Sequence, residues 1–192
     1  MLMAPVVAGS RLAAWQDNPV VVRPHAATAT KRFSSPTSAY SFDYPADWDA
    51  HEAGERVNVG AADGLVPTGR GFRTIYGAIL AIVDDPDAGK PDRTVESSAK
   101  AVIDGILKRN AHQSLSVPVR ADRPLAGAPA ANAVMQGTSP VTGRGERAEV
   151  VCRAFGTAQV FYVILVSPIE AYSELEQPLQ RLRDSIRLSD GK

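Results

Sequence analysis

The sequence has few of the residues on which disulfide, metal or nucleic-acid chemistry depends. Its 192 residues include one cysteine, Cys152, and three histidines, so no internal disulfide can form. Lysine plus arginine and aspartate plus glutamate number 21 each, and this balance gives no overall field that attracts nucleic acid or an anionic membrane. No apolar stretch approaches the ~18 residues of a membrane-spanning helix. The sequence therefore predicts a protein that binds no nucleic acid and is not transmembrane.

Each partial match to a catalytic or metal-binding motif in the sequence lacks residues that the motif requires. No two histidines have the spacing of metal ligands, and a calcium loop starting at Asp85 would place its third ligand at Gly89. The segment Gly64–Gly71 lacks the lysine and the following serine or threonine of a phosphate-binding loop. Cys152 stands in an apolar segment and is interpreted as a small buried hydrophobe. We therefore predict no catalytic residue, no metal ligand and no cofactor, and a protein that is not an enzyme.

The length of the chain fits one domain with a tail. Hydrophobic residues make up 44% of the sequence, which is enough apolar surface for a core without disulfides or a metal. Residues 1–38 are predicted to be an apolar N-terminal segment, interrupted by Arg11, followed by a Pro/Ala/Thr/Ser-rich linker. The apolar start is interpreted as a truncated signal peptide or as part of a longer chain. The folded domain is expected over residues 39–189.

Apolar runs bounded by turn residues predict the strands. The segment 159–166 has the strongest strand pattern, so we place it at the centre of the sheet, joined by a short turn at Gly156–Thr157 to an antiparallel neighbour. The Gly-rich segment from Ala61 to Gly71 is predicted to be a surface loop. The predicted strands are 40–44, 56–59, 75–83, 114–119, 131–136, 148–154 and 159–166.

Two segments have the spacing of amphipathic helices. Between Thr94 and Arg109, apolar side chains recur on one face. The second helix, Glu170 to Ile186, contains Pro178, from which we expect a kink or a restart. Because 75–83 is apolar on both faces, helices are expected on both sides of the sheet. The predicted fold is therefore α+β, an antiparallel sheet of about six strands covered on both faces by helices.

Four segments, in this order, resemble the PsbP-like family, an α-β-α sandwich. The first, Tyr40-Ser-Phe-Asp-Tyr-Pro-Ala-Asp-Trp48, is similar to the family's opening motif, an aromatic residue followed by Tyr-Pro and a tryptophan. The others are Arg123–Ala130, the strand around Val160 and the closing segment Leu182–Leu188. The resemblance covers roughly Tyr40 to Leu188. Together with the incomplete catalytic motifs, the resemblance implies an accessory or interaction module, and fold membership alone carries no activity.

The version of this family that the chain resembles most is the module appended to bacterial zinc endopeptidases that carry a His-Glu-x-x-His helix. The approach to that motif, His51-Glu52-Ala53-Gly54-Glu55, lacks the second histidine. The resemblance thus implies a noncatalytic module of an extracytoplasmic bacterial protein, periplasmic or secreted, whose partner is an unknown protein or a parent protease. Two alternatives stay open: a fragment or relative of a membrane-associated zinc metalloprotease without its catalytic domain, and a small-molecule binding domain.

One surface is predicted to contact a ligand or partner. Trp48 is a candidate for an aromatic platform, although closing the end of the core is the interpretation we favour for this ring. Arg70, Arg73 and Arg144 lie in or beside loops and are candidates for an anion-binding patch.

Overall fold

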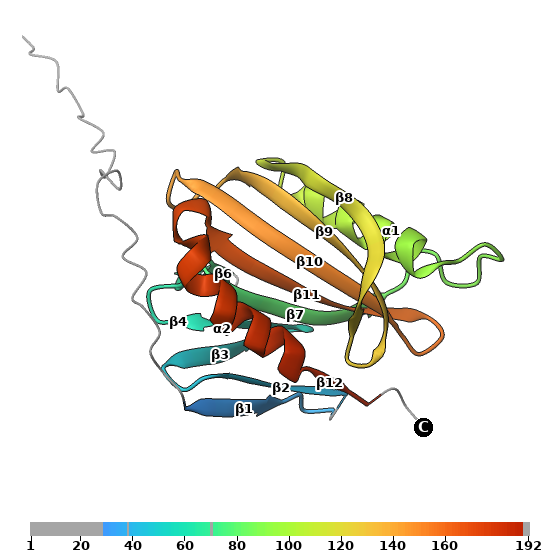
Figure 1. Cartoon of the computed structure of the whole chain (residues 1–192), viewed down its shortest axis with the longest axis horizontal. Helices are drawn as coiled ribbons and strands as arrows, with labels where there is room; N and C mark the ends of the chain where they lie inside the picture. The colour runs from blue at the N-terminus through green and yellow to red at the C-terminus, as the bar shows by residue number, and fades with distance from the viewer. Residues whose placement is uncertain (1–28, 38, 70, 190–192) are drawn as a thin grey trace, which may run out of the picture.

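The computed structural model describes residues 29–37, 39–69 and 71–189. A seven-stranded sheet, in which every neighbouring pair is antiparallel, forms the middle layer (Figure 1). In spatial order its strands are β3 (Trp48–Ala53), β4 (Arg56–Ala61), β7 (Gly77–Asp84), β11 (Gln159–Pro168), β10 (Gly145–Phe155), β9 (Ala128–Thr138) and β8 (Gln113–Leu125). Strand β11 lies at the centre of the order and is buried from Val160 to Pro168, as its continuous apolar run predicts.

Two smaller sheets complete the strands. Strands β1 (Thr30–Ser34), β2 (Tyr40–Pro45) and β12 (Arg187–Leu188) form one, and β5 (Leu65–Thr68) with β6 (Gly71–Thr74) forms a hairpin. Both include segments that we predicted to be irregular. Strand β1 begins at Thr30, inside the predicted linker, and the predicted loop of residues 61–71 contributes β5 and the start of β6. The rest of the predicted tail, residues 1–28, lies outside the described residues.

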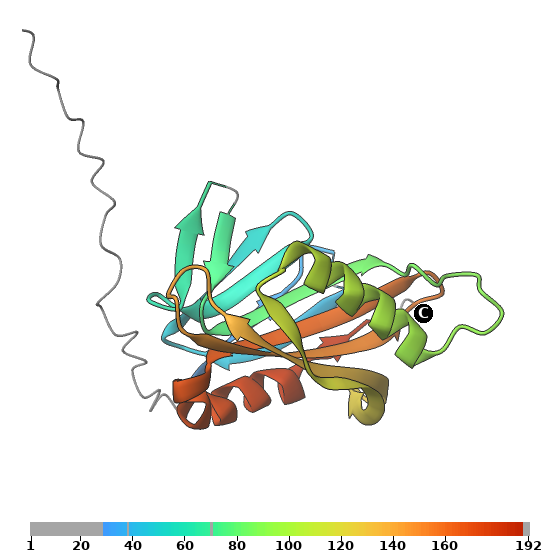
Figure 2. The ribbon, with the colours of Figure 1, turned by 90° about the horizontal axis from the view of Figure 1, so that it is seen from above.

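Helix α1 (Val95–Arg109) covers one face of the sheet, and α2 (Tyr172–Ser185) covers the other (Figure 2). The predicted helix-on-both-faces arrangement is confirmed, with seven strands in the main sheet instead of about six. The additional strand is β3, whose residues lie in none of the predicted strands. The short helix η1 (Ile169–Ala171) leads into α2, which continues through Pro178 as one helix where a kink or restart was expected. No helix in the described part of the chain has the length and hydrophobicity to cross a membrane.

Each helix seals its own hydrophobic core. Ile103 and Ile106, on the inner face of α1, pack with side chains of β9 and β10, and Thr94 caps this helix by accepting from the Ser97 backbone amide. On the opposite face of the sheet, Leu175 of α2 packs with Trp48 and other large side chains. Full burial of one such side chain contributes roughly 1.5–3 kcal/mol. The two cores fix the positions of both helices on the sheet. The fold therefore determines which parts of each sheet face no helix covers.

Candidate functional site

Helix α1 covers only part of its face of the sheet. It packs on β8, β9 and β10, while the face formed by β11, β7 and β4 continues beyond it. The β5–β6 hairpin stands on this same side of the sheet, beyond the open part, and is drawn in teal in Figure 2. A cavity of about 270 Å³ lies between the end of α1, the hairpin and the sheet. We call this cavity the α1 groove.

The floor of the α1 groove is apolar because strand alternation points one set of side chains towards it. Ile79 on β7 pairs with Ile164 on β11, and both line the groove. Val166 extends the same strip two residues further along β11. A ligand that lies on this floor would contact a continuous band of branched aliphatic side chains.

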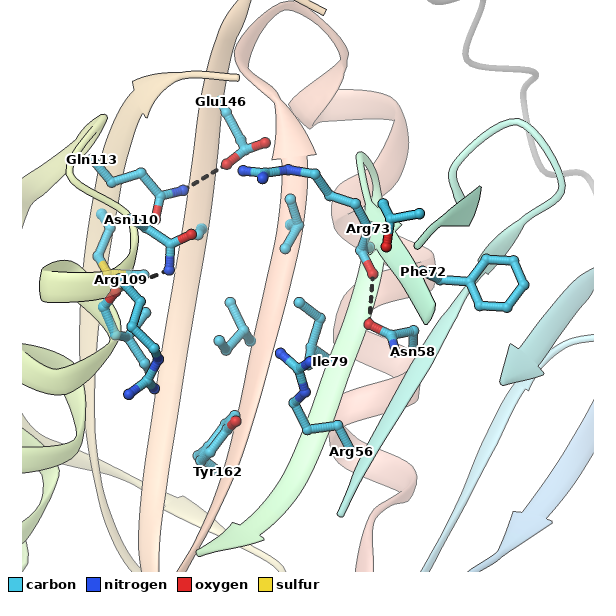
Figure 3. Close-up of a pocket in the computed structure, with 17 residues that line it drawn as sticks. Arg56, Asn58, Phe72, Arg73, Ile79, Arg109, Asn110, Gln113, Glu146 and Tyr162 are labelled. Carbon is cyan, nitrogen blue, oxygen red and sulfur yellow. Dashed lines mark hydrogen bonds between the residues drawn. The ribbon is translucent and has the colours of Figure 1, made fainter. Parts of the chain in front are cut away.

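Polar side chains gather at one end of the groove, around Tyr162 (Figure 3). Arg56 lies on β4 at the position paired with Ala81, which is itself paired with Tyr162, so the three share one row across the sheet. Arg109, the last residue of α1, approaches the same ring from the helix side. Burial raises the pKa of the Tyr162 phenol, and the two guanidinium groups oppose that rise. Both arginines are therefore close enough to act electrostatically on the Tyr162 phenol.

The other end of the groove holds a second polar cluster. Arg73 on β6 lies with its Nη2 atom 3.3 Å from Nε2 of His112. Glu146, which is buried, accepts a 2.6 Å hydrogen bond from Nε2 of Gln113. Burial raises the pKa of the Glu146 carboxyl, while Arg73, His112 and the Gln113 hydrogen bond act against that rise. This cluster carries both signs of charge.

Between the two clusters, Asn58 has an unmet hydrogen-bonding requirement. It lies two residues from Arg56 on the same face of β4, is only 2% exposed and lines the groove. Its Oδ1 atom accepts a 3.4 Å hydrogen bond from Thr74. Its Nδ2 atom has no hydrogen-bond partner within the part of the chain that the structure describes. A buried amide without a partner costs on the order of 1–3 kcal/mol, which an acceptor in the groove would reduce.

The predicted site residues are only partly brought together. Arg73 lies in the α1 groove. Trp48 is fully buried in the core beneath α2, which is the position that the favoured interpretation gave it, and it does not line the groove. Arg144 lies outside the groove and donates a 3.0 Å hydrogen bond to Glu170. Arg70 lies outside the described residues.

The residues that sequence reasoning missed come from four elements. They are Arg56 and Asn58 of β4, Arg109 of α1, Glu146 of β10 and Tyr162 of β11. One signal was present: β4 alternates polar residues with Val57 and Val59, whose side chains belong to the core beneath α2. Polar residues on the second face of a strand inside a sheet indicate a face that no helix covers.

A second cavity, of about 490 Å³, lies beside β2 and the β3–β4 turn. Its charged lining residues, within the described chain, are the acids Glu52 and Glu55. Its described lining contains no arginine or lysine, whereas Arg56 and Arg109 lie around Tyr162. We therefore take the smaller α1 groove as the candidate site, because placed polar groups over an apolar floor define a binding pocket better than volume does.

Comparisons with known proteins show the fold. No family model and no curated protein matches the chain. The chain is similar to the solved structure of cyanobacterial PsbP (CyanoP) from Synechocystis, at 12% identity over 83% of this chain and 92% of that one, with a TM-score of 0.53. It is also similar to the Ran-binding protein Mog1p of Saccharomyces cerevisiae, at 10% identity over 83% and 95% of the two chains, with a TM-score of 0.50.

A third similar structure is LpqN of Mycobacterium tuberculosis, which is involved in cell envelope biogenesis. It shares 10% identity over 83% of this chain and 90% of that one, with a TM-score of 0.50. These three neighbours confirm the PsbP-like α-β-α fold that the sequence motifs predicted. At this identity the likeness concerns the fold alone, and the relation to zinc endopeptidase modules stays a prediction.

Proposed function

We propose that this chain is a noncatalytic accessory module that binds a small molecule in the α1 groove. The observation that carries the proposal is the uncovered part of the α1 face, where an apolar floor lies between two sets of polar side chains. If α1 ended one turn later, the helix would cover this floor. If the β5–β6 hairpin were shorter, the floor would be open. Small-molecule sites combine an apolar lining with a few placed polar groups, and the groove has both.

The chemistry of the groove favours binding over catalysis. Glu146 in the groove and His112 beside it are the candidate proton-transfer residues, and each is engaged by a neighbour, Gln113 and Arg73 respectively. General acid–base catalysis needs such a group within reach of a reacting atom, usually with a nucleophile beside it. The described residues also contain no group of three or more side chains suited to hold a metal ion.

An extracytoplasmic setting, periplasmic or secreted, is the second part of the proposal. It is supported by a similar fold in LpqN, a protein of cell envelope biogenesis, and by the apolar segment at residues 1–14. Association with a zinc endopeptidase rests on the sequence resemblance. A reading frame that encodes His-Glu-x-x-His in the same transcript would favour it.

The binding site can be tested by filling it. Ile79→Trp places an indole on the groove floor, whereas Ile82→Trp makes the same change on β7 beside the second cavity. Saturation-transfer NMR with a mixture of medium-chain alcohols, acids and amines would report binding to each folded variant. We expect Ile79→Trp to abolish the signal and Ile82→Trp to retain it. Binding that survives Ile79→Trp and fails in Ile82→Trp would move the site to the other cavity.

A further inference from the structure

The two ends of the α1 groove differ in net charge. At the Tyr162 end, Arg56 and Arg109 make no ion pair within the described part of the chain. The acid that acts on this end is Glu55, in the β3–β4 turn, and its effect on the pKa of Tyr162 is the smallest among the groups that act on it. Two exposed guanidinium groups over one buried phenol therefore leave local positive charge without a partner.

The opposite end has its charge compensated. Arg73 acts electrostatically on the buried carboxyl of Glu146, and His112 and Gln113 also contact this cluster. An anion at this end would face the Glu146 carboxylate in a poorly hydrated place, where repulsion between like charges is costly. A negative group of a ligand is therefore favoured at the Tyr162 end and disfavoured at the Glu146 end.

The distance between the ends is set by the strands. Tyr162 and Val166 are four residues apart on β11, which corresponds to roughly 13 Å at 3.3 Å per residue. The strip between them is the apolar floor, with the free Nδ2 of Asn58 at its side. An extended molecule with an apolar body and one charged end matches this order of surfaces.

We propose that the groove selects a small organic anion, held with its carboxylate, sulfate or phosphate group between Arg56 and Arg109 over the Tyr162 hydroxyl and its apolar body along Ile79, Ile164 and Val166. This rests on the proposed function, since it names the ligand class of the same groove. Planar guanidinium groups donate paired hydrogen bonds that match such oxyanions. The volume of about 270 Å³ suits a single small molecule and not the two chains of a membrane lipid.

The first experiment uses the unmodified protein. Isothermal titration calorimetry compares octanoate with 1-octanol, which has the body without the charge, with acetate, which has the charge without the body, and with octylamine, which reverses the charge. We expect octanoate to bind at least about tenfold more tightly than the other three, because both the apolar strip and the arginine pair contribute only for octanoate. Amide chemical shifts in β4, β7 and β11 should change on addition of octanoate.

The second experiment removes the charges. The double variant Arg56→Gln with Arg109→Gln should weaken octanoate binding about tenfold and leave 1-octanol within about twofold, as expected for two exposed charge contacts. Arg120→Gln with Arg123→Gln, both exposed on β8 and outside the groove, removes the same charge and should change neither affinity. Unaltered thermal midpoints and amide spectra would verify that both double variants are folded.

The outcomes separate the two proposals. Equal affinity for octanoate and 1-octanol in the unmodified protein would overturn the anion site while leaving the groove as a binding site. Tighter binding of octylamine would overturn it as well. If none of the four probes binds, the proposed function and the anion site fail together. Cosedimentation with phosphatidylglycerol vesicles in the absence of octanoate binding would overturn the choice of a small free anion.

Discussion

Arg73 and His112 meet across the mouth of the α1 groove, with 3.3 Å between Nη2 of the arginine and Nε2 of the imidazole. Because a guanidinium group has donors and no acceptor, His112 accepts in this contact. The neighbouring residue in β6, Phe72, also lines the groove and stacks on His51 of β3 with ring centroids 4.1 Å apart. Two side-chain contacts therefore attach the hairpin to the rest of the domain, one to His112 and one to His51.

Removal of the first attachment should loosen the hairpin. A two-stranded hairpin has little stability alone, so Arg73→Ala should speed amide hydrogen exchange in β5 and β6 several-fold and lower the free energy of unfolding by no more than about 1 kcal/mol. Exchange in β10 and β11 should not change. Arg144→Ala, which removes an exposed contact to Glu170, serves as the matched control. Unchanged exchange in Arg73→Ala would show that the Phe72 stacking alone holds the hairpin.

The buried carboxyl of Glu146 should make stability depend on pH. Its pKa is raised on folding, chiefly by burial, so the folded state holds the proton more tightly than the unfolded state. The stability that this provides is complete at low pH and is lost as pH rises through the raised pKa. Urea unfolding of Glu146→Gln between about pH 4 and pH 7 should therefore lack a decline that the unmodified protein shows. Parallel pH profiles for the two proteins would contradict this.

Gly77, at the start of β7, is required for two independent reasons. Its φ angle is +135°, and a Cβ atom there would lie 2.0 Å from the backbone oxygen of Val59. Gly77→Ala should cost more than about 3 kcal/mol of unfolding free energy, because β4 and β7 would have to separate. Gly89→Ala, at φ +80° with open space around it, should cost only about 1 kcal/mol from backbone strain. Thermal unfolding that ranks the two equally would refute the close-approach argument.

Helix α1 gives a test of the core beneath it. Ile103 is fully buried, so Ile103→Asp places an unpaired carboxylate in an apolar layer at a cost of several kcal/mol, comparable to the ~5–15 kcal/mol that stabilises a domain. Lys100 is exposed and pairs with Asp104 at 2.7 Å, so Lys100→Gln should cost about 0.3–0.5 kcal/mol. Circular dichroism should show little folded Ile103→Asp and a normal Lys100→Gln.

The elements that were predicted correctly are those whose own residue pattern is sufficient to identify them. The apolar stripe of α1 and the continuous run of β11 need no distant partner to be recognised, and both are confirmed. Strand β1 was missed because its residues, Thr30 to Ser34, are mostly polar and exposed, and it is stabilised by pairing with β2 and by Phe33 stacking on Phe42 at 5.1 Å. The β5–β6 hairpin was missed because Pro67 and Gly69 have the composition of a loop.

The candidate site was harder to predict than the fold. Arg56, Arg109 and Tyr162 are separated by about fifty residues each in sequence, and only the strand order β4-β7-β11 with the end of α1 brings them together. No local spacing rule detects such a set, because the rules describe neighbours on one helix or strand. Arg73 was predicted because it lies beside a recognisable glycine-rich segment. The compensation of its charge by Glu146 could not be predicted from the sequence.

The small sheet of β1, β2 and β12 has a consequence for the connectivity of the chain. Leu188 pairs with Tyr40 at one end of β2, and Thr30 pairs with Pro45 at the other end. The first and last strands of the described fold thus lie on either side of one strand, with roughly 17 Å of β2 between those two pairs. A flexible peptide of about eight residues could join Leu188 to Thr30, and new termini could be opened at the exposed turn around Gly143. The architecture is therefore compatible with circular permutation, and the order of its segments along the chain can change while their order in space is kept.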